Sequence, residues 1–440
     1  MKEPSRPKDP AGWNPSSWLS NETTFAIWCI TAAFGAYFCM YGIRKPFTAT
    51  TYEGMTAFGM ELKSALVITQ VFGYMISKFI GIKVIAELPP YKRVRGILLL
   101  TSVALACLLG FAVVPTPLSV VFLFGNGLML GMVFGLVLGF LEGRRMTELL
   151  AAGLCASFIL ADGAAKSVGA WLMEQGIAET WMPFAAGTIF MIPLIGFLWM
   201  LSQIPEPGKT DQSERQERVR MNSADRRRYF MHYAPGLIAI ILAYLLITLI
   251  RSIRGDFAPE IWKGLGVETT PELFSISEMW IALGIIICSG VFSLYRNNRS
   301  ALFHSITVCI LGLGLLPISL MALDKQWVSP FWFMVLIGLG LYLPYVLVHT
   351  TLFERIMAVT PDKGNIGYLM YLADSTGYLG YVILMLFKDS LPAQDDTLSF
   401  FTTLCWLVGV FGIGAFLLAL NKSDKQVNTQ HNDRHCCYPN

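Results

Sequence analysis

Charged residues are scarce in this chain. Asp, Glu, Lys and Arg make up 14% of its 440 residues, hydrophobic residues make up 54%, and the mean hydropathy is +0.55. Soluble globular domains carry about 25% charged residues, so this composition excludes an ordinary soluble domain and predicts a protein embedded in the lipid bilayer. The net charge of +3 is small and the basic residues are dispersed, which excludes nucleic acid as a partner.

Motifs for covalent chemistry are also missing. The sequence contains no Gly-x-x-x-x-Gly-Lys-Ser/Thr loop for nucleotide phosphates, no His-Glu-x-x-His zinc motif and no Gly-x-Ser-x-Gly nucleophile turn. Most of the nine cysteines stand singly in apolar runs, as small buried hydrophobic residues do. We therefore predict neither an enzyme nor a pump driven by ATP, with no cofactor and no metal site.

Long apolar runs are what the sequence has instead. About twelve segments reach roughly 20 residues, enough for a helix to cross a bilayer core of about 30 Å. Helices satisfy their own backbone groups without water, so the predicted fold is all-α, with twelve transmembrane helices in two six-helix bundles. The predicted spans are 24–52, 62–86, 95–114, 118–141, 149–173, 182–203, 235–258, 273–295, 301–323, 328–352, 364–388 and 398–420.

One long polar interruption divides the spans into six and six. It contains prolines and a dense run of mixed charge, as solvated linkers do. Lys and Arg gather in alternate loops, so we expect both termini in the cytoplasm and the protein in the inner membrane of the cell. No secretory signal is recognisable before the first span. The predicted segments are an N-terminal segment 1–22, a first bundle 23–203, a linker 204–230, a second bundle 231–421 and a tail 422–440.

The two halves carry matching acidic residues. Glu142 and Asp162 are 20 residues apart, as are Glu354 and Asp374, and the second pair follows the first at an offset of 212. Many transporters are built from such related halves, with the substrate site between them. The spacing therefore predicts internal symmetry.

Two cations stand in an otherwise uncharged stretch. Arg44 and Lys45 follow Tyr41, and no other charge occurs from Thr23 to Tyr52. Unpaired cations inside a bilayer are expensive. Arg44 therefore either serves a central cavity or reaches the outer interface with its long side chain.

Several short motifs resemble one branch of the major facilitator superfamily. Span one reads Tyr-Gly-Ile-Arg-Lys-Pro-Phe at 41–47, and span seven has Arg251 followed by Asp at +5, an aromatic at +6 and Pro at +8. Gly-Tyr-Met-Ile-Ser-Lys-Phe at 73–79 and Gly-Leu-Tyr-Leu-Pro at 340–344 add to the pattern. These motifs are similar to those of the organophosphate:phosphate antiporters, which include the glycerol-3-phosphate and hexose-phosphate transporters.

The resemblance implies that one arginine from each half, Arg44 and Arg251, clamps a phosphate group. Chemistry favours the same choice, because a guanidinium stays charged in a low dielectric and offers a planar fork of donors to an oxyanion. Lys166 stands where the antiporters usually have a histidine, and further lysines would add positive field. The predicted substrate-binding residues are Arg44, Lys45, Arg251, Lys166, Lys78 and Tyr41.

Other charged residues have open interpretations. Asp162 and Lys166 are four residues apart on one helix face, so they either neutralise each other or serve substrate binding and coupling. Arg254 lies nearly a turn beyond Arg251 and is expected nearer the membrane interface than Arg251. The predicted coupling residues or internal counter-ions are Asp162, Asp374 and Glu278. The predicted gating or structural ion pairs at cytoplasmic helix ends involve Glu142, Arg144, Glu354 and Arg355.

Together these patterns predict a monomeric secondary active transporter. Its substrate would be a small anionic solute, in particular a phosphorylated metabolite, and protons or inorganic phosphate would be the coupling ion. Two alternatives remain: a transporter-like sensor of a sugar phosphate, and a flippase for lipids or lipid-linked precursors.

Overall fold

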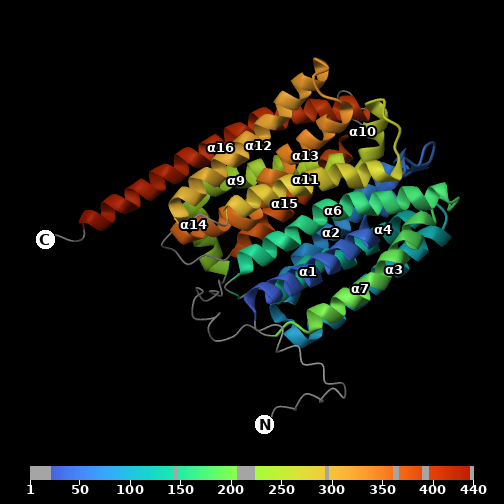
Figure 1. Ribbon diagram of the computed structural model, residues 1–440, viewed down its shortest axis with the longest axis horizontal. Helices are drawn as coiled ribbons and strands as arrows, with labels where there is room; N and C mark the ends of the chain where they lie inside the picture. Colours follow the sequence, from blue (N-terminus) through green and yellow to red (C-terminus); the bar gives the residue numbers. More distant parts are fainter. Residues whose placement is uncertain are drawn as a thin grey trace, which may run out of the picture.

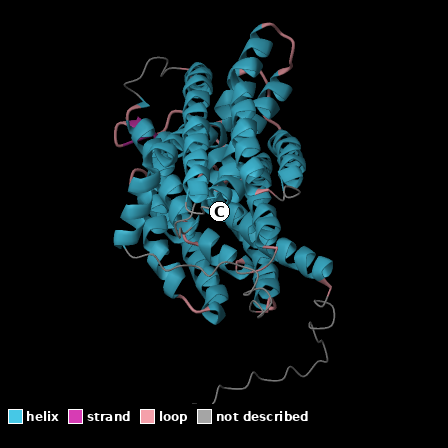
Figure 2. Ribbon diagram, turned by 90° about the vertical axis from the view of Figure 1, so that its left-hand side faces the viewer, coloured by secondary structure: helices cyan, strands magenta, loops and turns pink. Residues whose placement is uncertain are grey.

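The structure is a computed structural model that describes residues 21–142, 144, 146–205, 223–292, 297–359, 366–388 and 396–436. Within these ranges twelve helical segments are long and apolar enough to cross a membrane, which confirms the predicted all-α transmembrane fold. Figure 2 shows that helices make up nearly all of the described molecule, with short strands at one edge of the view.

The first half supplies six spans, the fourth of which is formed by two consecutive helices, from Ser119 to Leu141. The two strands form an antiparallel hairpin between the first and second spans. The elements are α1 (Glu22–Arg44), the 3-10 helix η2 (Pro46–Ala49), β1 (Thr56–Ala57), β2 (Met60–Glu61), α2 (Leu62–Glu87), α3 (Pro90–Val113), α4 (Ser119–Leu130), α5 (Val133–Leu141), α6 (Thr147–Glu174) and α7 (Met182–Ser202).

The second half also supplies six spans. Its fourth span changes from an α-helix to one π-helical turn, η3, and back. The elements are α9 (Ser223–Asp256), α10 (Ala258–Gly264), α11 (Pro271–Phe292), α12 (Asn298–Asp324), α13 (Pro330–Leu347), η3 (Val348–Leu352), α14 (Phe353–Val359), α15 (Ile366–Leu386) and α16 (Thr397–Cys436).

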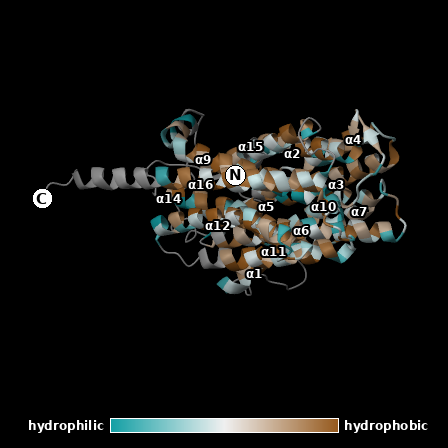
Figure 3. Cartoon of the chain, turned by 90° about the horizontal axis from the view of Figure 1, so that it is seen from above, coloured by the Kyte–Doolittle hydropathy of each residue, from teal (hydrophilic) through white to brown (hydrophobic). Residues whose placement is uncertain are grey.

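The halves form two adjacent bundles, coloured blue to green and yellow to red in Figure 1. Across their boundary α6 packs against α11 and α2 packs against α15. The approach is close at Gly163 of α6, where an added Cβ would lie 2.6 Å from the carbonyl oxygen of Phe274. Hydrophobic residues, brown in Figure 3, recur along the helices of both bundles, and Leu99 and Ile192 are 65% and 72% exposed. Lipid contact explains such exposure.

Three helix ends differ from the predicted spans. α1 ends at Arg44 instead of continuing to residue 52, because Pro46 has no N–H to continue the helical hydrogen bonds, and a short 3-10 helix follows. α9 begins at Ser223, inside the predicted linker, and α16 continues to Cys436, inside the predicted tail. Residues 1–20, 206–222 and 437–440 of the predicted polar segments lie outside the described residues.

The two ends of the bundles are named by the direction of α1. We call the end at which α1 begins the terminal face, and the end at which α1 finishes the opposite face. The hairpin and α10 lie at the opposite face, whereas α14 lies toward the terminal face.

Candidate functional site

A central cavity lies between the two bundles. Its free volume is about 20 Å³, room for about one water molecule, so in this arrangement the cavity is tightly closed. Both halves contribute to its wall, as expected for a site between related bundles. The lining residues are Tyr41, Arg44, Lys45, Val71, Asp162, Arg251, Ser252, Gly255, Asp256, Tyr342 and Tyr378.

Two arginines in this cavity are buried without an ionic partner. Arg44 is 2% exposed and Arg251 is 8% exposed, and within the described ranges neither side chain makes a hydrogen bond or an ion pair. Aromatic faces hold them instead: the guanidinium carbon of Arg44 lies 3.7 Å from the ring centre of Tyr74, and that of Arg251 lies 4.3 Å from the ring centre of Tyr345. Two uncompensated cations that share one cavity favour an anionic ligand.

Buried amides fix the helix end that carries Arg44. Gln70 donates to the Arg44 carbonyl at 2.8 Å, and Asn126 donates to the Ile43 carbonyl at 3.3 Å. The two amides also bond each other at 2.9 Å. They satisfy backbone carbonyls near the point where Pro46 stops the helix. The prediction from sequence missed both amides, although a Gln and an Asn inside apolar runs were a usable signal.

The three lysines of the predicted site are each paired with a carboxylate. The pairs are Lys45 with Asp256, Lys78 with Asp374, and Lys166 with Asp162, where Nζ lies 2.5 Å from Oδ2. Asp162 and Asp374 therefore compensate lysines and leave the two cavity arginines free. The first two pairs join one half to the other, whereas the third is an i,i+4 contact within α6.

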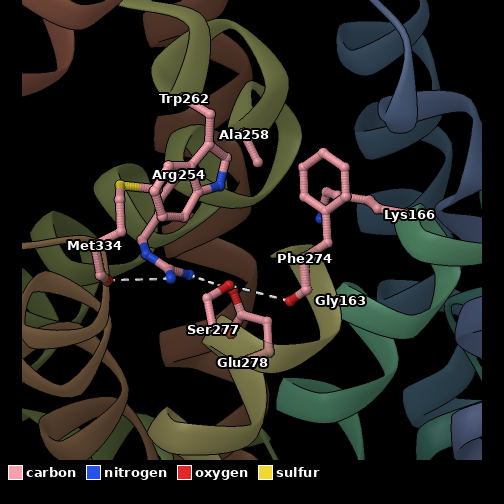
Figure 4. A pocket seen from close by; sticks show the side chains of 9 residues that line it. All are labelled: Gly163, Lys166, Arg254, Ala258, Trp262, Phe274, Ser277, Glu278 and Met334. Carbon is pink, nitrogen blue, oxygen red and sulfur yellow. Dashed lines mark hydrogen bonds and ion pairs between the residues drawn. The ribbon is translucent and has the colours of Figure 1, made fainter. Parts of the chain in front are cut away.

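A second, smaller pocket, with a free volume of about 10 Å³, lies between α6 and the second half (Figure 4). Arg254 donates to Glu278 Oε1 at 2.6 Å and to the Met334 carbonyl at 3.2 Å, while Gly163 and Lys166 form the wall contributed by the first half. Arg254, expected nearer the membrane interface than Arg251, has a side chain that is 2% exposed and is compensated by Glu278.

The opposite face is closed by ion pairs between the halves. Lys63 Nζ lies 2.5 Å from Glu260 Oε1, and Lys263 Nζ lies 2.7 Å from Glu53 Oε1. The pKa of Glu53 lies below its ordinary value because this carboxylate accepts a hydrogen bond from Lys263 and faces its positive charge. On the terminal side of the cavity, Lys78 joins the second half through its aspartate. The cavity is thus bounded on both sides.

The residues predicted for gating lie toward the terminal face. Arg144 donates to the carbonyl of Pro205, just after α7, and Arg355 donates to Asn298 Oδ1 at the start of α12. Each of these contacts lies within one half. The half-buried acidic members of the predicted set are Glu142 and Glu354. A gating role for this set stays a prediction.

Transporters of known structure have a similar fold. A D-xylose–proton symporter aligns with a TM-score of 0.62 at 13% identity, covering 90% of this chain and 97% of that one. A bacterial homologue of the human lysosomal transporter Spinster, inward-facing and unoccupied, gives 0.57 at 11% identity, covering 91% and 97%. The POT family transporter PepTSo gives 0.57 at 13% identity, covering 92% and 98%. Such identities show the fold alone, that of the major facilitator superfamily; the likeness to the organophosphate antiporters stays a prediction.

No curated protein sequence matches the chain. The family described as "Family of unknown function (DUF5690)" matches residues 46–422, which include every residue lining the cavity except Tyr41, Arg44 and Lys45. The chain therefore belongs to this family of unknown function, DUF5690, and has the major facilitator fold.

Proposed function

We propose that this protein is a secondary active transporter of a small anionic solute, and that Arg44 and Arg251 bind the anion. The observation that carries the proposal is that two buried guanidiniums in one cavity have no ion pair within the described ranges, whereas Lys45, which lines the same cavity, is compensated by Asp256. A doubly charged oxyanion would neutralise both arginines and supply the acceptors that they lack. A phosphorylated metabolite is the substrate class that we expect.

Alternating access supplies the mechanism that this fold supports. The two bundles would rock about the cavity, so that contacts at one face break while those at the other face hold. Opening the opposite face would separate Lys63 from Glu260, and opening the terminal face would separate Lys78 from Asp374. We propose that the terminal face is cytoplasmic, because Lys and Arg gather in its loops. Catalysis on a covalent bond is not part of this function.

The test compares the two cavity arginines with a buried arginine that has its own counter-ion. Purified protein is assayed in liposomes for exchange of radiolabelled inorganic phosphate and in detergent for thermal stabilisation by phosphate and by phosphorylated sugars. Arg44→Gln and Arg251→Gln should each abolish exchange and stabilisation. The double variant Arg254→Gln/Glu278→Gln is the matched control: it removes a buried arginine together with its counter-ion, and it should retain stabilisation by the anion.

Three outcomes separate the alternatives. Normal exchange in both single variants would refute the assignment of Arg44 and Arg251. Stabilisation by a sugar phosphate without any flux in the wild-type protein would favour a sensor. Neither stabilisation nor exchange with any phosphorylated anion would remove the proposed substrate class.

A further inference from the structure

A second cluster of ionisable groups lies on the terminal side of the cavity, next to the arginine site. Asp374 of α15 accepts a hydrogen bond from Tyr244 of α9 and an ion pair from Lys78 of α2. His349, in the π-helical turn η3, places Nε2 at 3.2 Å from Asp374 Oδ1. All four residues are buried. The cluster therefore joins three helices of the second half to one helix of the first.

Hydrogen-bond accounting assigns the tautomer of His349. The hydroxyl of Tyr244 donates its hydrogen to Asp374, yet its oxygen lies 2.6 Å from His349 Nε2. Nε2 must then be the donor, so the neutral ring carries its lone pair on Nδ1. Nδ1 is buried and has no hydrogen-bond partner in the described structure. Nδ1 is thus a basic nitrogen without a partner, on a ring whose other nitrogen contacts a carboxylate. It can accept a proton once water solvates it.

Few other groups compete for that proton. In the described ranges the titratable groups around His349 and Asp374 include Lys78 of α2, Cys155 of α6, Tyr244 of α9, Tyr345 of α13, and Tyr371 and Tyr378 of α15. α14 continues the chain after η3 with Glu354 and Arg355 in its first turn. The residues that α12 buries are uncharged. Among the hydrogen-bond and ion-pair partners of Asp374 in the described ranges, Lys78 alone belongs to the first half, so this partner leaves when the halves separate.

We infer that His349 and Asp374 form a proton-binding site, and that Lys78 and the proton compete for the Asp374 carboxylate. With the terminal face closed, Lys78 compensates Asp374 and the ring stays neutral. When the terminal face opens, Lys78 moves away with α2 and water enters. A proton bound at Nδ1 of His349 then restores neutrality to the second half, because the imidazolium takes the place of the ammonium.

The same separation also affects the anion site. The ring of Tyr74 lies 3.7 Å from the Arg44 guanidinium carbon and 5.3 Å from Lys78 Nζ, and Tyr378, which lines the cavity, lies 5.1 Å from Lys78 Nζ. A Lys78 released from Asp374 adds uncompensated positive charge beside the arginines. Proton and anion therefore favour the same open state, and by linkage each increases the affinity for the other. This coupling rests on the proposed transport function, whereas the proton site can be tested without an anion.

The experiment measures terminal-face opening as a function of pH. Spin labels are attached through Arg95→Cys on α3 and His304→Cys on α12, both exposed toward the terminal face, in a full-length variant without its native cysteines. The distance between the two spin labels is measured by pulsed electron paramagnetic resonance between about pH 5 and pH 8, the range in which histidine ordinarily titrates. Lowering the pH should increase the population of a longer distance, by about 5 Å or more.

Two variants and one control make the outcomes decisive. His349→Gln should stay at the shorter distance throughout, and His349→Asn repeats the test if the first variant does not fold. Asp374→Asn should give the longer distance at every pH, because Lys78 has lost its partner. His232→Gln, at an exposed histidine on α9, should keep the wild-type profile. A wild-type profile in His349→Gln, a pH-independent wild type or a closed Asp374→Asn would each overturn the proton site.

Added inorganic phosphate distinguishes the two proposals. Phosphate should move the opening transition of the wild-type protein to higher pH, and Arg251→Gln should abolish this shift while retaining the response to pH alone. A response to pH without any effect of phosphate would leave the proton site standing and would count against the anion site. An effect of phosphate on a protein that does not respond to pH would support the anion site and overturn the proton site.

Discussion

Breaking the ion pair between Lys45 and Asp256 should destabilise the protein more than removing the pair altogether. The two side chains are 10% and 2% exposed, and the pair joins the first half to the second. Lys45→Met would leave the Asp256 carboxylate buried, with the hydroxyl of Tyr381 at 3.0 Å as its remaining partner. Asp256→Asn would leave a buried ammonium. Lys45→Met/Asp256→Asn leaves neither charge.

The expected magnitude follows from the burial of the pair. Removing one member of a buried ion pair costs about 3–5 kcal/mol, because the other charge stays desolvated. In a folding unit of about 150–250 residues, 1 kcal/mol lowers the Tm by about 2–4 °C. Each single variant should therefore unfold at least about 6 °C below the wild type, and the double variant should recover most of this loss.

Thermal unfolding in detergent, followed by intrinsic fluorescence, measures the effect. The matched control is Glu53→Gln/Lys263→Met, which removes an ion pair whose side chains are 70% and 73% exposed and should change the Tm little. A double variant at Lys45 and Asp256 that loses as much as both single variants together would refute the reasoning. Single variants with the same Tm as the control variant would also refute it.

Three further predictions concern other contacts. Gly163→Ala should weaken the packing between the halves, because the added Cβ would lie 2.6 Å from the Phe274 carbonyl oxygen. The distance between spin labels on α6 and α11 should increase, and an unchanged distance would contradict this. The ion pair between Glu53 and Lys263 should contribute fully above about pH 4.3 and be lost as the pH falls further, because folding lowers the pKa of the Glu53 carboxyl. The distance between spin labels at the opposite face should therefore stay constant between about pH 5 and pH 8. Asn126→Ala should lower stability by about 1–3 kcal/mol, because it removes a buried amide that donates to the Ile43 and Ala104 carbonyls. Thermal unfolding measures this loss, and an unchanged Tm would contradict the role.

The sequence by itself determined the class of fold and the most informative cations. Apolar runs of bilayer length predicted twelve helices, because hydropathy depends on residues that are consecutive in the chain. Arg44 stood out for the same reason, as a charge inside such a run. The contact of Asp162 with Lys166 was also accessible, because residues four apart share a helix face.

Only the tertiary structure decided which charges compensate each other. Lys45 and Asp256 are 211 residues apart, and Lys78 and Asp374 are 296 apart, so their pairing depends on how the two bundles meet. His349 gave no signal in the sequence, because its meaning comes from Tyr244 and Asp374 on other helices. Local patterns specify helices and their faces, but the partner of a buried charge is selected by packing between distant segments. Among the residues that the structure describes, this packing leaves Arg44 and Arg251 in the cavity without an ion pair.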